Sequence, residues 1–179
     1  ALTQLVEQKL RALRVICMRD ADLLGPVDHL ADVGWLSDRA WLAHVVWPSA
    51  EEVVRLGAAG VGAAHCPSSN MVLGSGLAPI AELRAAGAPV GLGVDGSASA
   101  DSASLWLEAR TAMLQGKLRQ GAAAMSARDA LEIATRGGAA VLGRAGEIAE
   151  LSVGACGDLA VWPLSGVAFA GALSDPVEA

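Results

Sequence analysis

Short apolar runs alternate with helical patterns through the middle of the chain. Nearly continuous apolar runs predict buried β-strands over residues 41–46, 61–66 and 90–95. Segments with helical spacing at 48–60, 78–89 and 102–119 predict helices between and after these strands. Buried strands that alternate with helices are typical of a parallel sheet covered by helices. The pattern therefore predicts an α/β fold, either an open sheet or a piece of a barrel.

Capping residues and glycines refine the expected helix boundaries. Ser49 is placed to cap the helix of 48–60, with Glu51 and Glu52 in its first turn. For the helix of 102–119 we expect an apolar face, made of Leu105, Ala109, Ala112 and Met113. The glycines in "GLG" at 91–93 lie within a predicted strand, where they indicate close packing against a neighbouring element.

Further elements are expected toward both ends of the chain. Helical spacing predicts helices at 3–18 and 27–33, and Gly34 stands where the second one needs a left-handed cap. A helix beginning after Ser126 is expected to end at Gly137-Gly138. Residues 153–171 then change character and predict two short strands about a turn.

Composition limits the class of protein. The 179 residues suffice for one domain but fall short of the ~250 of a complete (β/α)₈ barrel. With 53% hydrophobic and 18% charged residues, the chain is not generally disordered, and its core would consist of Ala, Val and Leu. A net charge of −6 with scattered Lys and Arg argues against nucleic acid as a partner.

Cysteine spacing and the absence of long apolar runs bear on location. Cys17, Cys66 and Cys156 are far apart and form no CxxC pair, which argues against a disulfide framework and a thiolate zinc site. No apolar run reaches the roughly 18 residues of a membrane span, so we expect no membrane partner. A reducing cytoplasm is the expected location.

Polar residues stand in or just past the second half of each predicted strand. They are His44, His65 and Asp95. Active sites of parallel α/β proteins are assembled at the carboxyl ends of the strands. Imidazole and carboxylate groups bind zinc and similar ions, and a carboxylate beside a metal-bound water can move protons. The pattern thus indicates metal-assisted hydrolysis. The alternatives are core histidines for His44 and His65, and a helix cap for Asp95.

Other possible motifs are weaker. "HLAD" at 29–32 resembles a metal motif, but too little chain separates it from His44 for a strand–helix–strand unit, so we place His29 on a helix surface. Ser68, Ser69 and the serines of 97–102 lack a general base at motif spacing, which argues against a serine hydrolase. "GLG" also lacks the dinucleotide-binding fingerprint, which leaves an oxidoreductase unsupported.

Taken together, several segments resemble the amidohydrolase superfamily. They are "WLAHVV", "AHCPSSNMVLGSGLAPI", "PVGLGVDGSASAD", "EARTAML", "SARDALEIATRGGAAVLGR" and "GDLAVWPLSGVAFAG". The resemblance covers roughly residues 25–176 and lies in the branch of cytosine, guanine, S-adenosylhomocysteine and triazine deaminases or hydrolases. Within that branch, "CPSSNM", "GVDGSASAD" and "LSGVAFAGALSDPV" are most similar to the 8-oxoguanine deaminases.

The resemblance implies a fold, a reaction and roles for four residues. It implies strands 6 to 8 of a (β/α)₈ TIM-type barrel with part of a small β domain, and hydrolytic deamination of a purine-like aromatic amine. Asp95 would bind one divalent ion, zinc, and shuttle protons. His44 would polarise the substrate and stabilise the tetrahedral intermediate, while His65 and Asn70 would lie near the substrate.

Other features of that family have no counterpart in this sequence. The His-x-His pair of strand 1, the metal histidine of strand 5 and its associated glutamate are missing, so one metal ligand of four remains. We divide the chain into a helical leader unlike the family (1–24), a partial barrel (25–145) and a partial β domain (146–179). A half barrel leaves open sheet edges, so we expect a homo-oligomer or pairing with a missing N-terminal half. We expect the chain alone to be inactive and not to retain zinc; the alternative is a non-catalytic truncated or assembly module.

Overall fold

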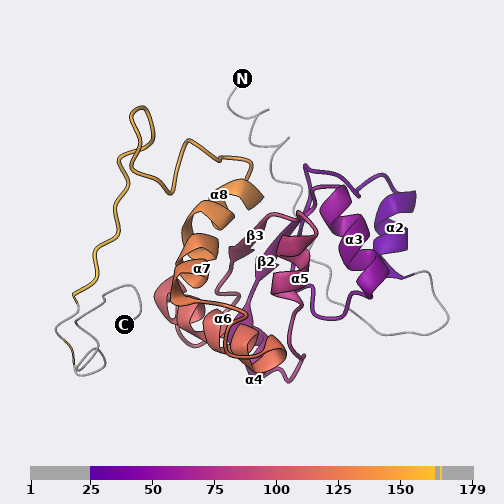
Figure 1. Ribbon diagram of the computed structural model, residues 1–179, viewed down its shortest axis with the longest axis horizontal. Helices are drawn as coiled ribbons and strands as arrows, with labels where there is room; N and C mark the ends of the chain where they lie inside the picture. Colours follow the sequence, from indigo (N-terminus) through magenta and orange to yellow (C-terminus); the bar gives the residue numbers. More distant parts are fainter. Residues whose placement is uncertain (1–24, 164–165, 167–179) are drawn as a thin grey trace.

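A three-stranded parallel sheet forms the centre of the protein. The computed structural model describes residues 25–163 and 166. Strands β1 (Trp41–Ala43), β2 (Gly62–His65) and β3 (Val90–Leu92) lie in the order β1-β2-β3 (Figure 1). The parallel register pairs Leu42 with Ala63 and Ala63 with Val90. The predicted parallel α/β arrangement is therefore confirmed, although each strand is shorter than expected.

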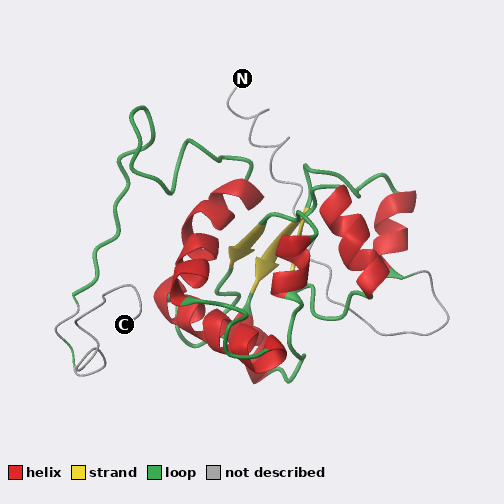
Figure 2. Cartoon of the chain, in the orientation of Figure 1, coloured by secondary structure: helices red, strands yellow, loops and turns green. Residues whose placement is uncertain are grey.

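Helices pack around the sheet (Figure 2). Their bounds are α2 Pro26–Asp32, α3 Ala50–Ala58, α4 Pro67–Val72, α5 Ile80–Ala85, α6 Leu105–Gln120, α7 Ala127–Glu132, the π-helical turn η1 Ile133–Gly137, and α8 Gly138–Val141. The sheet lies between the pair α2 and α3 on one side and the run from α7 to α8 on the other. The predicted helices at 27–33, 48–60, 78–89 and 102–119 correspond to α2, α3, α5 and α6. The short helix α4 was not predicted.

Local sequence signals start and end several of these helices. Ser49 forms a capping box with Glu52: the Glu52 N–H donates to Ser49 Oγ (3.2 Å), and the Ser49 N–H donates to Glu52 Oε2 (2.7 Å). Ser126 forms the same motif with Asp129 at the start of α7. Gly34 follows α2 with φ +73°, the left-handed conformation that glycine adopts without strain. These predicted boundary residues are confirmed.

The prediction that Gly137-Gly138 ends a helix is wrong. Both glycines lie inside a continuous helical run, because η1 passes directly into α8. Their role is close packing on β3: a Cβ on Gly137 would lie 2.0 Å from the Val90 carbonyl oxygen, and one on Gly91 would lie 2.8 Å from Gly138 Cα. The interpretation of "GLG" as a close-packing strand is confirmed by the same contact.

The buried face of α6 differs from the predicted apolar face. Ala109 and Ala112 are buried as expected, but Leu105 is 43% exposed. Two polar residues, Glu108 and Gln115, are buried instead. They lie seven positions apart, which places them on the same side of the helix. The buried side of α6 therefore contains the polar side chains of Glu108 and Gln115 in place of part of the expected apolar face.

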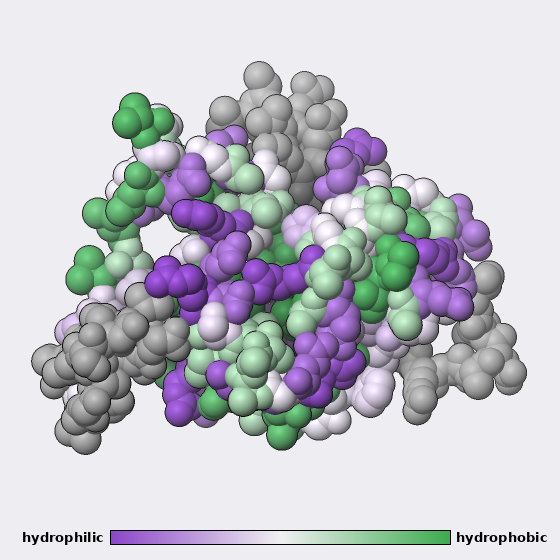
Figure 3. Space-filling view, viewed as in Figure 1, coloured by the Kyte–Doolittle hydropathy of each residue, from purple (hydrophilic) through white to green (hydrophobic). Residues whose placement is uncertain are grey.

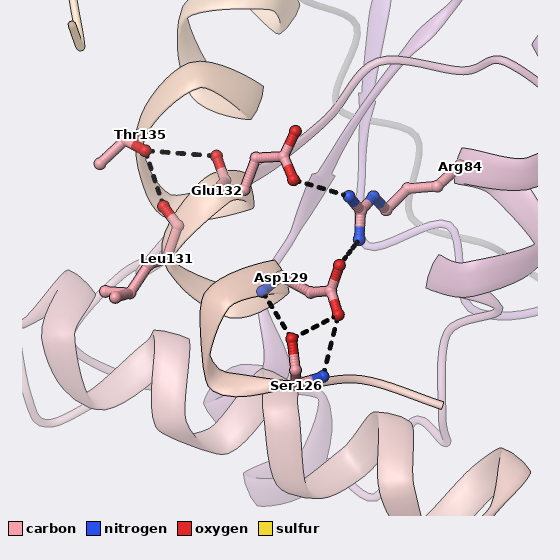
Figure 4. Close-up of polar contacts among 6 residues, drawn as sticks. All are labelled: Arg84, Ser126, Asp129, Leu131, Glu132 and Thr135. Carbon is pink, nitrogen blue, oxygen red and sulfur yellow. Dashed lines mark hydrogen bonds and ion pairs between the residues drawn. The ribbon is translucent and has the colours of Figure 1, made fainter. Parts of the chain in front are cut away.

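Large aliphatic side chains fill the space between the sheet and its helices. The most deeply buried are Leu30, Leu56, Leu83, Met125 and Ile133. Helix α5 is also tied to its neighbours by ion pairs (Figure 4): Arg84 reaches Asp129 and Glu132, each at 3.2 Å. Because these charges are partly exposed, each pair adds about 0–1 kcal/mol and the apolar core supplies most of the stability.

The chain after α8 differs from the prediction over its described part. Residues 153–163 form no strand, so the two strands expected in 153–171 are wrong there. Val153 and Leu159 are exposed. Figure 3 shows apolar side chains along the arm that follows α8, at the upper left of the view. A strand needs a ladder of main-chain hydrogen bonds to a neighbouring strand. On this arm the Ala155 N–H donates to the Ser152 carbonyl (3.1 Å) and the Cys156 N–H donates to the Glu147 carbonyl (2.8 Å), and these bonds close turns without forming a ladder. The rest of that segment, and the helix expected at 3–18, lie outside the described residues.

No helix in the described part of the chain is long and apolar enough to span a bilayer.

Candidate active site

The carboxyl ends of the three strands bring the predicted polar residues to one edge of the sheet. His44 follows β1, His65 ends β2 and Asp95 follows β3. The His44 Nε2 and Asp95 Oδ2 atoms are 3.5 Å apart, although 51 positions separate the residues along the chain. His29, by contrast, is exposed on α2 as predicted and takes no part in this cluster. The site is therefore centred on His44 and Asp95.

Unusual backbone geometry places both side chains. His44 (φ +69°), Val45 (φ +44°) and Asp95 (φ +63°) all adopt the left-handed region. This conformation is uncommon for residues other than glycine and costs most for a β-branched residue such as Val45. The chain leaves extended geometry at His44, directly after the end of β1, and again at Asp95, three residues after the end of β3. Rare backbone conformations concentrate at functional sites, and here they occur beside the two central side chains.

Hydroxyl groups surround the Asp95 carboxylate. Ser69 Oγ donates to Asp95 Oδ2 at 2.7 Å, and Ser99 Oγ donates to the same oxygen at 3.2 Å. The hydrogen bond from Ser69 is the main cause that lowers the pKa of Asp95 below 3.8; burial opposes it, and the Gly96 N–H, His44 and Ser99 also lower the pKa. Asp95 is therefore an ionised acceptor at neutral pH.

Asn70 orients the His44 ring. Asn70 Oδ1 lies 2.9 Å from His44 Nδ1. An amide oxygen only accepts hydrogen bonds, so Nδ1 carries the hydrogen and Nε2 is the nitrogen that faces Asp95. The structure thus joins His44, Asn70 and Asp95 through direct polar contacts. Their ring nitrogen and carboxylate are suited to exchange a proton with a molecule bound beside them.

His65 adjoins this cluster without a hydrogen bond to it. Its side chain is 2% exposed, and burial, followed by the charge of His44, lowers its pKa to about 3. The imidazole is therefore neutral at physiological pH. The structure places His65 within electrostatic reach of His44, while Asn70 makes the direct contact with that ring.

Sequence reasoning missed four contributors to the site. Ser69 and Ser99 bind Asp95, although the sequence alone had only discounted serines as nucleophiles. Glu108 accepts a hydrogen bond from the Ser68 N–H (3.0 Å), and Gln115 Nε2 donates to the Pro67 carbonyl (3.0 Å). Helix α6 thereby holds α4, which carries Ser69 and Asn70. The signal in the sequence was the pair of polar residues seven positions apart on an otherwise buried side of α6.

The described residues do not supply a complete zinc site. Zinc sites in proteins use three or four protein ligands. No group of three or more His, Cys, Asp or Glu side chains in residues 25–163 and 166 is placed to hold a metal ion. Asp95 offers an ionised carboxylate, and the partly buried His44 and the buried His65 offer ring nitrogens, but these groups do not converge on one point. A complete site therefore needs ligands from outside the described residues.

The lowered pKa of Asp95 predicts a pH-dependent contribution to stability. A carboxyl group whose pKa is lower in the folded state stabilises the fold above its unfolded pKa and loses that effect as the pH falls through the folded value. The advantage of the native chain over Asp95→Asn in the free energy of unfolding should therefore be full above about pH 5 and shrink as the pH falls through 3.8 and below. Urea unfolding of both chains across this range measures it. A difference that stays constant with pH would contradict the hydrogen-bond account.

Comparison with known proteins defines the class. The amidohydrolase family matches residues 17–177, and the chain belongs to this family. It is 53% identical over 156 residues to the 8-oxoguanine deaminase of Pseudomonas aeruginosa, a match that covers 87% of this chain and 34% of that protein. It is 47% identical over 137 residues to the 5-methylthioadenosine/S-adenosylhomocysteine deaminase of Halobacterium salinarum, covering 76% and 31%.

Solved structures give the same relationship. A triazine hydrolase variant matches with a TM-score of 0.79 and 41% identity, covering 86% of this chain and 34% of that one. The zinc complex of the atrazine chlorohydrolase TrzN from Arthrobacter aurescens matches with a TM-score of 0.77 and 40% identity, covering 87% and 34%. The predicted superfamily and α/β class are confirmed. The chain spans about one third of the length of these relatives.

Proposed function

We propose that this chain forms part of a metal-dependent hydrolytic deaminase that acts on a purine-like aromatic amine of the 8-oxoguanine or guanine class. The observation that carries the proposal is the pairing of His44 Nε2 with Asp95 Oδ2 at 3.5 Å, at the carboxyl edge of a parallel sheet. The 53% identity to an 8-oxoguanine deaminase supports the choice of substrate class. In this proposal β1, β2 and β3 are strands 6, 7 and 8 of a (β/α)₈ barrel, with residues 25–145 in the barrel and 146–179 in a small β domain.

Asp95 and His44 would carry out the proton transfers. Asp95 is an ionised base held by two serine hydroxyls, and it would take a proton from the attacking water and pass it to the leaving amine. His44, held by Asn70 at Nδ1, would present Nε2 to the reacting group and stabilise the negative charge that develops there. The Asn70 contact fixes the ring orientation that both roles require.

His65 and Asn70 are the proposed substrate contacts. Asn70 Nδ2 is buried and has no hydrogen-bond partner in the described part of the chain. Because Oδ1 of the same amide is occupied by His44, Nδ2 remains as a donor for a carbonyl oxygen of the substrate. A neutral His65 would complement this donor with an uncharged ring nitrogen.

The proposed cofactor is one zinc ion. Zinc lowers the pKa of a bound water toward 7 and so supplies a nucleophile at neutral pH. Solved relatives include an adenosine deaminase from Xanthomonas campestris and TrzN, both described with zinc. Asp95 would supply one ligand, and the others would come from outside the described residues. We therefore propose that the chain alone neither retains the ion nor turns over substrate.

A non-catalytic assembly module is the second candidate. The observation that favours it is that no three or more potential metal ligands lie together within the described residues. Metal analysis of the purified chain, followed by measurement of ammonia release from 8-oxoguanine and guanine, distinguishes the two candidate functions when the result is positive. Bound zinc with turnover would exclude the non-catalytic module, and would also overturn the proposal that the chain is inactive alone.

We also propose that the open edge of the sheet pairs with further polypeptide, either a second copy or an N-terminal half of the barrel. β1 is an edge strand, and an apolar hollow of about 30 Å³ lies beside it, lined by residues that include Val27, Leu42 and Trp47. Trp47 is 60% exposed. Unpaired strand edges beside apolar surface favour association. Sedimentation of the purified chain should show a dimer or larger species, and a stable monodisperse monomer would contradict self-pairing.

A cytoplasmic location is proposed from the cysteines. Cys66 is buried, Cys156 is exposed, and no disulfide joins these two described residues.

A further inference from the structure

A small cavity lies behind the site, between α5 and α6. Its volume is about 10 Å³, which matches the roughly 10–15 Å³ needed to hold one water molecule. Five of its lining residues are polar, namely His65, Glu82, Gln115, Arg119 and Gln120, and the others are apolar. The cavity is therefore large enough for a single water and carries polar groups to bind it.

Three buried polar atoms without a partner belong to residues in the wall of this cavity. Within the described chain, His65 Nδ1, Glu82 Oε2 and Gln115 Oε1 are buried and accept or donate no hydrogen bond. Leaving such groups unpaired is costly, and buried water commonly satisfies them. A water with three such neighbours has the usual number of hydrogen bonds for a buried molecule.

The chemistry of two of these atoms is fixed by their other contacts. Gln115 Nε2 donates to the Pro67 carbonyl at 3.0 Å, which leaves the buried Oε1, an acceptor only, without a partner among the described residues. Glu82 Oε1 accepts from Arg119 Nε at 3.0 Å, so Glu82 is an ion-paired carboxylate and its Oε2 is likewise an acceptor. These two oxygens take both hydrogens of a water placed between them.

We propose that one water molecule occupies this cavity and sets the tautomer of His65. The water donates one O–H to Gln115 Oε1 and the other to Glu82 Oε2. Only its lone pairs then remain for His65, so Nδ1 must carry the ring hydrogen and donate it to the water. Nε2 is left with a lone pair. If the proposed function holds, His65 can therefore only accept a hydrogen bond at Nε2, and it selects for an N–H group on the bound molecule.

Nuclear magnetic resonance of the ¹⁵N-histidine-labelled 179-residue chain tests this assignment. The chain holds three histidines, so the ring signals of His65 can be separated with a His29→Gln and a His44→Gln variant. In the native chain we expect the protonated ring nitrogen of His65 to be Nδ1. A hydrogen on Nε2 of the native chain would overturn the proposal by itself. A crystal structure with no water in the cavity would also overturn it.

Two matched variants isolate the role of the acceptor. Glu82→Ala removes the Oε2 acceptor, frees one O–H of the water to donate to Nδ1, and should move the His65 ring toward the Nε2–H tautomer. Arg119→Gln breaks the same ion pair but leaves Glu82 Oε2 in place, so the Nδ1–H tautomer should persist. An unchanged tautomer in Glu82→Ala, or an equal shift in Arg119→Gln, would overturn the bridging water.

Discussion

Replacing Asp95 with asparagine is expected to lower ammonia release by about 10²–10⁴-fold, the range for loss of a positioned proton-transfer group. The assay uses a chimera in which this chain replaces the matching region of the Pseudomonas aeruginosa 8-oxoguanine deaminase, because the chain spans 34% of that protein. Asparagine tolerates the left-handed conformation at φ +63°, and its oxygen can still accept from Ser69. The variant therefore removes the charge with little disturbance of the loop.

Asp101→Asn is the matched control for that substitution. Asp101 lies six residues after Asp95 in the same loop, and it is exposed. Its replacement by asparagine changes the net charge by the same amount as Asp95→Asn does. We expect its chimera to keep ammonia release within a few-fold of the native one. Comparable losses in both variants would show that the effect comes from the loop as a whole, and an active Asp95→Asn chimera would remove Asp95 from the proton-transfer role.

Gly137→Ala is expected to destabilise the fold by about 1–3 kcal/mol or more, the range for overpacking a close contact. A Cβ at this position would lie 2.0 Å from the Val90 carbonyl oxygen, so η1 would have to move away from β3. The contact involves backbone on the strand side, which cannot rotate aside as a side chain could. Urea unfolding at constant pH measures the loss in the free energy of unfolding.

The neighbouring Gly138→Ala provides the control for that measurement. Gly138 has φ −59° in α8, and a Cβ there meets nothing within 4 Å. Alanine in a helix is favoured over glycine by about 0.5–1 kcal/mol, so this variant should be as stable as the native chain or more stable. If both variants unfold at the same urea concentration, the close packing of η1 on β3 is not what these glycines serve.

The alternation of strands and helices could be predicted because it depends on local patterns. The apolar run of 61–66 and the Ser49 capping box each carry their own signal, and the structure has β2 and α3 at these places. The strand ends could not be predicted, since nothing in the apolar pattern marks the left-handed conformations at His44 and Asp95. Neither residue is a glycine that would have marked a turn.

The error at Gly137-Gly138 has a tertiary cause. Glycine at the end of a helical pattern usually marks its C-terminus, but here the glycines allow a helix to approach β3 closely. Nothing local to 126–143 distinguishes these two uses. The strands expected in 153–163 failed for a similar reason, because a strand depends on a partner that the pattern of one segment does not contain.

The residues of the candidate site could be predicted from the sequence only in part. His44 and Asp95 stood out because ionisable residues are unusual at the ends of apolar strands. Ser69 was missed because α4, at six residues, is too short to show a helical period. Glu108 was missed because a carboxylate on a helix is ordinarily taken for a solvent-facing residue, whereas this one is 1% exposed and holds the Ser68 N–H.

Ammonia release from 8-oxoguanine by the zinc-loaded native chimera tests the central proposal most directly. If His44, Asn70 and Asp95 form a working part of a deaminase site, the chimera should turn over 8-oxoguanine or guanine, and the chain alone should not. A chimera that folds and binds zinc but releases no ammonia from either substrate would contradict the proposed function and favour a non-catalytic module.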